Sequence, residues 1–232
     1  MVCLSQLPKR EEWIFREPPE VEGIKMQFRL IYHGPLPSES GSNTRKKAKN
    51  SIRRILHRQL EQFWKEVPND LGFMAFAPNP SIQLPNSKNP QEIAEDHKLA
   101  NRNNHIYRFV PLIGRRFAIA CSLDILFLRR DDPGGLIKHG GDIDNRLKVL
   151  FDALRVPQNS SELPEDPPHE GEDPFYCLME DDKFITKVSV TTDRLYTPID
   201  EAGEHLHDVY LVIGVEPVVL NPIYAPWKMW VR

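Results

Sequence analysis

The chain has 232 residues and a mass of 26.9 kDa, with 40% hydrophobic residues, 27% charged residues and a formal net charge of -3. A chain of this length buries roughly 70% of the surface of its unfolded form, so it needs neither disulfides nor a structural metal to hold a core. Nucleic-acid-binding domains usually have a pI above about 9. The pI of this sequence is near 6.3, which counts against nucleic acid, although the sum hides how the charges are arranged.

The cysteines and the apolar runs bear on the cellular compartment. Cys3, Cys121 and Cys177 are odd in number and have no CxxC spacing, so neither a disulfide framework nor a zinc ribbon is indicated. A Lys-Arg-Glu-Glu cluster precedes any apolar stretch of signal-peptide length. No run approaches the roughly 18 uncharged apolar residues of a membrane span. We therefore expect a cytoplasmic protein with no membrane segment.

The first regular elements are a strand and a helix. Residues 24–32 alternate between apolar and polar side chains, which predicts a half-buried strand that ends at Gly34. Apolar residues within 48–64 follow the spacing of one helical face. Residues 42–44 offer an N-cap for this helix, and Pro68 ends it.

A long insertion separates this helix from the next regular elements. Residues 67–108 are rich in proline and asparagine, and we expect an irregular insertion with a short helix near 91–99. Residues 117–127 alternate strongly and predict a central strand. A second helix is expected from residue 144 to residue 154, and Pro157 stops it.

The last third of the chain holds an acidic stretch and two strands. Residues 157–174 contain five prolines and six acids but no lysine or arginine, which predicts a disordered or mobile acidic loop. Residues 184–191 and 208–215 alternate as strands do. This order of elements favours an α+β fold, a single domain with a mixed β-sheet covered by two main helices and interrupted by long loop insertions.

Acidic residues gather at the start of the second predicted helix. Asp144, Lys148 and Asp152 are spaced four residues apart, which places them along one side of the helix. Asp142 lies just upstream in extended backbone and can approach the same point. Carboxylates held close together repel one another, and a divalent cation relieves that repulsion.

A second acidic pair precedes a predicted strand. Asp181 and Asp182 could be carried by the sheet to the end of the second helix, where three or four carboxylates would converge. Such an all-oxygen cluster suits Mg²⁺ or Mn²⁺, and Lys148 would add a positive charge beside it. A structural interpretation has equal weight, because aspartates are also common N-caps and turn residues.

The two acidic blocks together resemble those of the RusA-type Holliday junction resolvases, which are small Mg²⁺-dependent endonucleases. The family's D-x-D-N-x-x-K segment runs here from Asp142 to Lys148, with a later acid at Asp152 and an Asp-Asp pair at 181–182. The resemblance implies catalytic and metal-binding roles for Asp142, Asp144 and Asp182, and an essential lysine at Lys148. Three neighbours would support them as a second shell: Asn145, Asp152 and Asp181. The resemblance also implies a homodimer and a single RusA-like nuclease domain over residues 1–232.

Two segments depart from the family pattern. Family members are typically shorter, so the insertion at 67–108 and the acidic loop at 157–174 are additions. An acidic loop beside the site would repel DNA unless it moved aside.

The first predicted helix carries a dense basic run. Residues 45–58 contain seven positive charges and no acid. Phosphate contacts by these residues would give salt-sensitive, sequence-independent affinity for DNA. The expected DNA-binding residues are Arg45, Lys46, Lys47, Lys49, Arg53, Arg54 and Arg58. A solvated helix face is the alternative, but so many like charges need a compensating anion.

These features predict a Mg²⁺-dependent endonuclease, with Mn²⁺ as a second usable ion, that hydrolyses phosphodiester bonds in branched or four-way DNA during recombination or repair. The alternative is a non-catalytic DNA-binding or regulatory module that keeps the fold, with the acidic loop as a DNA mimic or docking segment. Intact carboxylates together with the lysine favour the enzyme.

Overall fold

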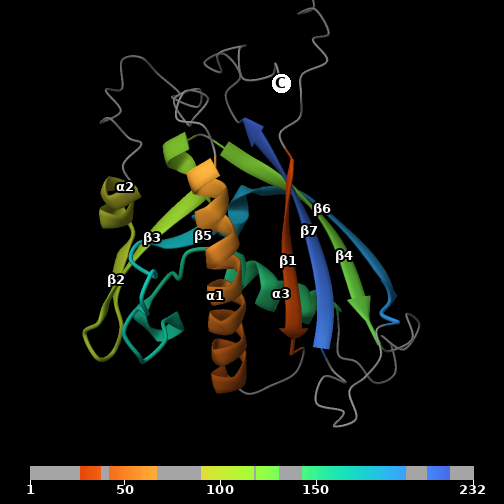
Figure 1. Cartoon of the computed structure of the whole chain (residues 1–232), viewed down its shortest axis with the longest axis horizontal. Coiled ribbons are helices and arrows are strands. Elements are labelled where there is room, and N and C mark those ends of the chain that lie inside the picture. The colour runs from red at the N-terminus through yellow and green to blue at the C-terminus, as the bar shows by residue number, and fades with distance from the viewer. Residues whose placement is uncertain are drawn as a thin grey trace, which may run out of the picture.

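The structure is a computed structural model, and it describes residues 27–37, 42–66, 90–117, 119–130, 143–196 and 208–219. Within them lie two β-sheets and three α-helices (Figure 1). The α+β class and the two main covering helices predicted from the sequence are confirmed, but the strands divide between two sheets. No helix among the described residues is long and apolar enough to cross a membrane.

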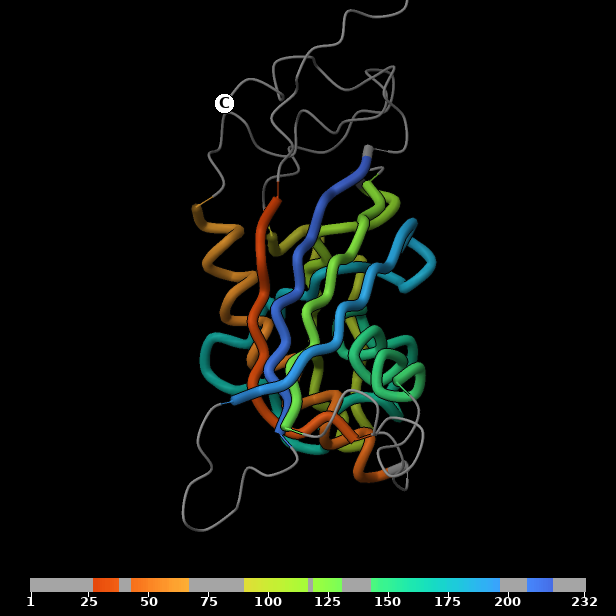
Figure 2. Tube along the Cα trace, turned by 90° about the vertical axis from the view of Figure 1, so that its right-hand side faces the viewer, coloured from red at the N-terminus to blue at the C-terminus, as the bar shows by residue number. Residues whose placement is uncertain are grey.

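The larger sheet has four strands in the order β1-β7-β4-β6, and Figure 2 shows them side by side. Strand β4 pairs antiparallel with β7 and parallel with β6, while β7 pairs antiparallel with β1. Their bounds are β1 Phe28–Pro35, β4 Ile119–Arg129, β6 Ile185–Arg194 and β7 Asp208–Val219. All four were predicted, with boundaries that shift by a few residues.

The smaller sheet has three strands in the order β2-β3-β5, with β3 parallel to β5 and antiparallel to β2. Their bounds are β2 Lys98–Ala100, β3 Ile106–Ile113 and β5 Phe175–Met179. The backbone after the second main helix extends this sheet, because Arg155 forms a parallel bridge with Met179 and the Val156 N–H donates to the Met179 carbonyl at 2.9 Å.

The helices pack against these sheets. The long helix α1 (Ser42–Glu66) contacts β1, β5 and α3 (Ile143–Leu154), while α2 (Pro90–Asp96) contacts β3. Ile52 of α1, Leu150 of α3 and Leu123 of β4 are all fully buried in one core. Each such side chain contributes about 1.5–3 kcal/mol through burial. This core fixes α3 against the sheets and so fixes the start of α3 in space.

The insertion predicted as irregular is partly regular. Residues 67–89 lie outside the described residues, but 90–108 form α2, β2 and the start of β3. The short predicted helix is therefore confirmed as α2. Strand β3 was missed because its apolar run, residues 109–113, contains a proline and lacks the period-2 pattern.

The acidic loop is ordered, contrary to the prediction of a disordered or mobile segment. We call residues 157–174 the acidic strap. Leu163 of the strap is only 1% exposed, in an apolar cluster with Tyr107 and Phe175. The Asn101 side chain donates to three consecutive strap carbonyls, those of Pro164, Glu165 and Asp166, at 2.9, 3.1 and 3.2 Å. The buried Leu163 and the three hydrogen bonds from the Asn101 side chain hold the strap in place. Disorder was predicted from composition, which does not reveal these contacts.

Candidate functional site

The first acidic block lies at the start of α3. Asp144 is in the first turn, is exposed, and its Oδ1 accepts a hydrogen bond from the Asn145 N–H at 2.8 Å. Lys148 follows one turn later and is also exposed. The opposite side of α3 buries Leu150 and Leu154 in the core. The helix therefore presents Asp144 and Lys148 to solvent together, as the spacing predicted, while Asp142 lies outside the described residues.

The second acidic block forms a single turn between β5 and β6. Asp181 is the N-cap of the short helix η5 (Asp182–Phe184), and its Oδ1 accepts from the Lys183 N–H at 3.0 Å. That hydrogen bond, followed by the Lys183 charge, lowers the pKa of Asp181. Asp182 is exposed, whereas Phe184 is buried in the main core. Asp181 thus shapes the turn from which Asp182 points outward.

The fold brings the two blocks to one region. Helix α3 contacts η5, and Phe184 shares a core with Val149 and Leu150 of α3. Among the described residues, no three His, Cys, Asp or Glu side chains form a group that could hold a metal ion. Since Asp142 is not described, the predicted triad is represented by Asp144 and Asp182 alone. Both supply carboxylate oxygens, the ligand type that Mg²⁺ prefers.

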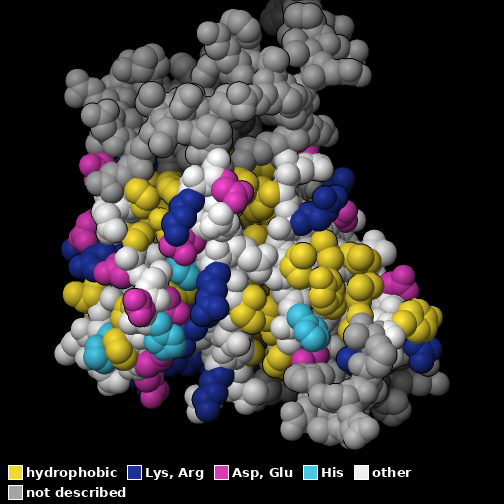
Figure 3. Space-filling view, viewed as in Figure 1, with side chains coloured by type: hydrophobic (Ala, Val, Ile, Leu, Met, Phe, Trp, Pro, Cys, Tyr) yellow, Lys and Arg dark blue, Asp and Glu magenta, His cyan; other side chains and the backbone are white. Residues whose placement is uncertain are grey.

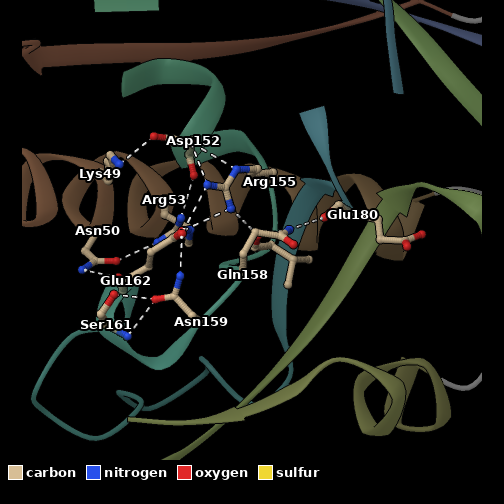
Figure 4. A network of polar contacts seen from close by, with 11 residues as sticks. Lys49, Asn50, Arg53, Asp152, Arg155, Gln158, Asn159, Ser161, Glu162 and Glu180 are labelled. Carbon is tan, nitrogen blue, oxygen red and sulfur yellow. Dashed lines mark hydrogen bonds and ion pairs between the residues drawn. The ribbon is translucent and has the colours of Figure 1, made fainter. Parts of the chain in front are cut away.

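Asp152 serves a different purpose from the predicted support of a metal site. It accepts from Lys49 at 2.6 Å and from Arg155 at 2.7 Å, and Arg155 also bonds Glu162 of the strap (Figure 4). Burial alone would raise the pKa of Asp152, but Lys49 and Arg155 hold it below its ordinary value. Asp152 lies eight residues beyond Asp144, roughly 12 Å along the helix. Its ion pair with Lys49 joins α3 to α1.

The basic helix divides into three groups of residues. Arg53 is 3% exposed and donates to the Asn50 side chain and to the Asp152 carbonyl, both at 2.7 Å, so the predicted DNA contact by Arg53 is wrong. Three others are paired with acids, namely Lys46, Lys49 and Arg54. The remaining three are exposed, namely Arg45, Lys47 and Arg58. Figure 3 shows Lys and Arg side chains spaced along α1 on this face.

The acidic strap supplies the anion that the basic helix requires. Arg54 bonds Asp166 at 2.7 Å and Glu172 at 2.9 Å, and Glu172 is only 6% exposed. Lys46 lies 4.0 Å from Glu165. Burial would raise the pKa of Asp166, but its hydrogen bond with Arg54 lowers it. The two oppositely charged segments, more than a hundred residues apart in sequence, therefore neutralise each other in part.

A polar pocket that was not predicted from the sequence lies beside the second acidic block. It has a volume of about 380 Å³ and is lined by residues that include His97, Arg115, Gln158, Glu180 and Asp181. Glu180 accepts from the Arg115 N–H at 2.9 Å, and its own N–H donates to the Ile113 carbonyl at 2.8 Å. These bonds fix the backbone that leads into η5.

Comparisons with known proteins add no relative. No family model, no curated protein and no solved structure matches the chain.

Proposed function

We propose that the chain is a Mg²⁺-dependent endonuclease that cuts phosphodiester bonds in branched DNA, in the manner of a Holliday junction resolvase. One observation carries the proposal: α3, which exposes Asp144 and Lys148, packs on η5, which exposes Asp182. Because all three side chains face solvent, they are accessible to a phosphate group.

The residues present fit an oxygen-coordinated divalent cation. Asp144 and Asp182, with Asp142, would hold Mg²⁺ or Mn²⁺. When bound, such an ion polarises a phosphate and lowers the pKa of a coordinated water. Lys148 lies one helical turn from Asp144, where its charge can stabilise the negative charge that develops on a phosphate oxygen. The positive dipole end of α3 favours the same anion.

Other parts of the proposal come from the family resemblance and the charge distribution. A homodimer would present two such sites to opposed strands of a junction. The exposed Arg45 and Arg58 of α1 would contact the phosphates of duplex arms without reading sequence. We place the protein in the cytoplasm, in keeping with the free and buried thiols of Cys121 and Cys177.

A cutting assay tests the proposal. The full chain is incubated with a synthetic four-way junction or a linear duplex, in Mg²⁺ or in EDTA. We expect Mg²⁺-dependent cutting of the junction, and a loss of at least about 100-fold in Asp144→Asn and Asp182→Asn, because even outer partners of metal ligands are worth 10–100-fold. Asp193→Asn is the matched control, because Asp193 is exposed near the opposite end of β6, roughly 26 Å along the strand.

The outcomes separate the proposal from its rival. Binding without cutting by the wild type would show a non-catalytic DNA-binding module. Equal cutting of junction and duplex would overturn the preference for branched DNA and leave the nuclease activity standing. If the wild type and Asp144→Asn cut DNA equally well, Asp144 of α3 is not part of the active site.

A further inference from the structure

A groove runs between α1 and the acidic strap. Its volume is about 580 Å³, and its lining includes Lys46, Lys47, Ser51 and Ile55 on the α1 side and Glu165 on the strap side. Lys47 and Ser51 are exposed, and the Ile55 side chain is 38% exposed despite its apolar character. One wall thus offers charge, a hydroxyl and an apolar contact within about two and a half turns of helix.

The cations of the groove differ in how firmly they are held. Arg54 is fixed by two carboxylates at 2.7 and 2.9 Å. Lys46 lies 4.0 Å from Glu165, and the side chains of Lys46 and Glu165 are 22% and 73% exposed. A pair this long with one largely exposed partner contributes little to stability. Lys46 and Lys47 can therefore turn to a phosphate at small cost, whereas Arg54 cannot.

The other wall of the groove is negative. Its acids are Glu165, which is exposed, and Asp166, which pairs with Arg54. Glu170 of the strap is also exposed but does not line the groove. In Figure 3, acidic side chains lie to one side of the basic row over α1. At physiological salt the Debye length is about 8 Å, so a second phosphate chain laid across the strap would feel this repulsion.

From this pairing of walls we infer that the groove binds one unpaired strand of DNA and discriminates against a duplex. Lys46 and Lys47 contact the phosphates, and Ile55 packs against a sugar or base. A duplex carries twice as many charges for the same length as a single strand, and its second strand would lie over the strap. The inference rests on the proposed function in one respect, namely that the chain binds DNA.

Fluorescence anisotropy of the full chain in EDTA tests the inference without cutting. The probes are a labelled oligothymidine and a labelled duplex of equal length. We expect tighter binding of the single strand. The Lys46→Gln/Lys47→Gln variant should bind it several-fold more weakly, with a salt slope shallower by about 0.7 for each lost phosphate contact. Lys65→Gln/Lys98→Gln is the control, since both lysines are exposed and neither lines the groove.

A change on the acidic wall tests the discrimination itself. Glu165→Lys should raise duplex affinity more than single-strand affinity and so narrow the preference. Two results would contradict the inference: an equal rise in affinity for both probes in Glu165→Lys, or equal losses of single-strand affinity in the groove variant and the control variant. Neither result would bear on Mg²⁺-dependent cutting. If the wild type cuts no DNA but still binds the single strand more tightly than the duplex, the proposed nuclease activity is wrong and the inference about the groove holds.

Discussion

His57 is a buried residue of α1 that uses both ring nitrogens. Its Nδ1 accepts from the Tyr176 N–H at 2.9 Å, and its Nε2 donates to the Gly171 carbonyl of the strap at 3.0 Å. The side chain is 4% exposed and its ring lies against Phe175. Only a neutral imidazole can accept at Nδ1. Burial lowers the pKa of His57, and the positive charge of Arg58 lowers it further. The hydrogen bond to Gly171 and the charges of Glu61 and Glu172 raise the pKa, but burial dominates.

This arrangement predicts that stability falls at acidic pH. The folded-state pKa of His57 lies below its unfolded value of about 6.5. Its contribution is therefore complete above that pH and is lost as the pH falls toward the folded-state pKa, because the unfolded chain binds a proton that the folded chain does not. Protonation would leave the Tyr176 N–H without an acceptor, a cost of about 1–3 kcal/mol.

Urea unfolding measured at several pH values checks this. His57→Gln can still accept from Tyr176 but cannot titrate, so we expect a flatter dependence of unfolding free energy below pH about 6.5. His105→Gln, on a partly exposed histidine, should leave the wild-type slope. An unchanged slope in His57→Gln would assign the effect to another group, with His97 the next candidate because burial lowers its pKa too.

At the scale of elements, a network of charges joins α1, α3 and the strap. Arg155 at the end of α3 donates to Asp152 at 2.7 Å and to Glu162 of the strap at 3.2 Å. Its side chain is 11% exposed, and its guanidinium also donates to the Val156 carbonyl at 3.0 Å. Arg155 therefore ties α3 to the strap, and Asp152, which also pairs with Lys49, adds α1 to the network.

Removing that side chain should loosen the junction. Arg155→Met keeps much of the volume but leaves Asp152 and Glu162 without this donor. We expect a loss of about 1.5–3 kcal/mol in unfolding free energy, the usual contribution of a hydrogen bond to a charged group. Lys65→Gln on the exposed side of α1 should cost no more than about 0.5 kcal/mol. Chemical denaturation measures both, and equal values would show that the network adds no stability.

Elements with strong periodicity could be predicted from the sequence, and those held by distant partners could not. The alternation in β4 and the helical spacing in α3 are local, so their existence and the exposure of Asp144 and Lys148 followed directly. Strands β3 and β5 are short apolar runs, which periodicity cannot assign. Arg53 has the same residue type as its exposed neighbours, and only the position of α3 reveals that it is buried.

The arrangement of charges in the whole molecule explains how a net charge of -3 is compatible with the proposed binding of DNA. Several acids of the strap form ion pairs with Arg54, Arg108 and Arg155, so much of the strap's negative charge is neutralised. The exposed part of α1 remains positive. The composition of the acidic loop predicted that it would repel DNA, whereas the fold pairs part of its charge with arginines of other segments.

The last prediction concerns what holds the strap. If ion pairs alone held it, 1 M salt would release it, since the Debye length there is about 3 Å. Leu163 is 1% exposed among Tyr107, Phe109 and Phe175, so we expect the apolar anchor to dominate.

Leu163→Ala should cost about 2–5 kcal/mol and speed hydrogen exchange of the strap amides, while salt should change exchange little. Val188→Ala, at a site 41% exposed, is the control and should stay within about 0.5 kcal/mol. Fast strap exchange in salt but not in Leu163→Ala would show that charge holds the strap. In that case salt would weaken the inferred discrimination against duplex DNA in two ways. It would screen the charge of the acidic wall, and it would release the strap from α1.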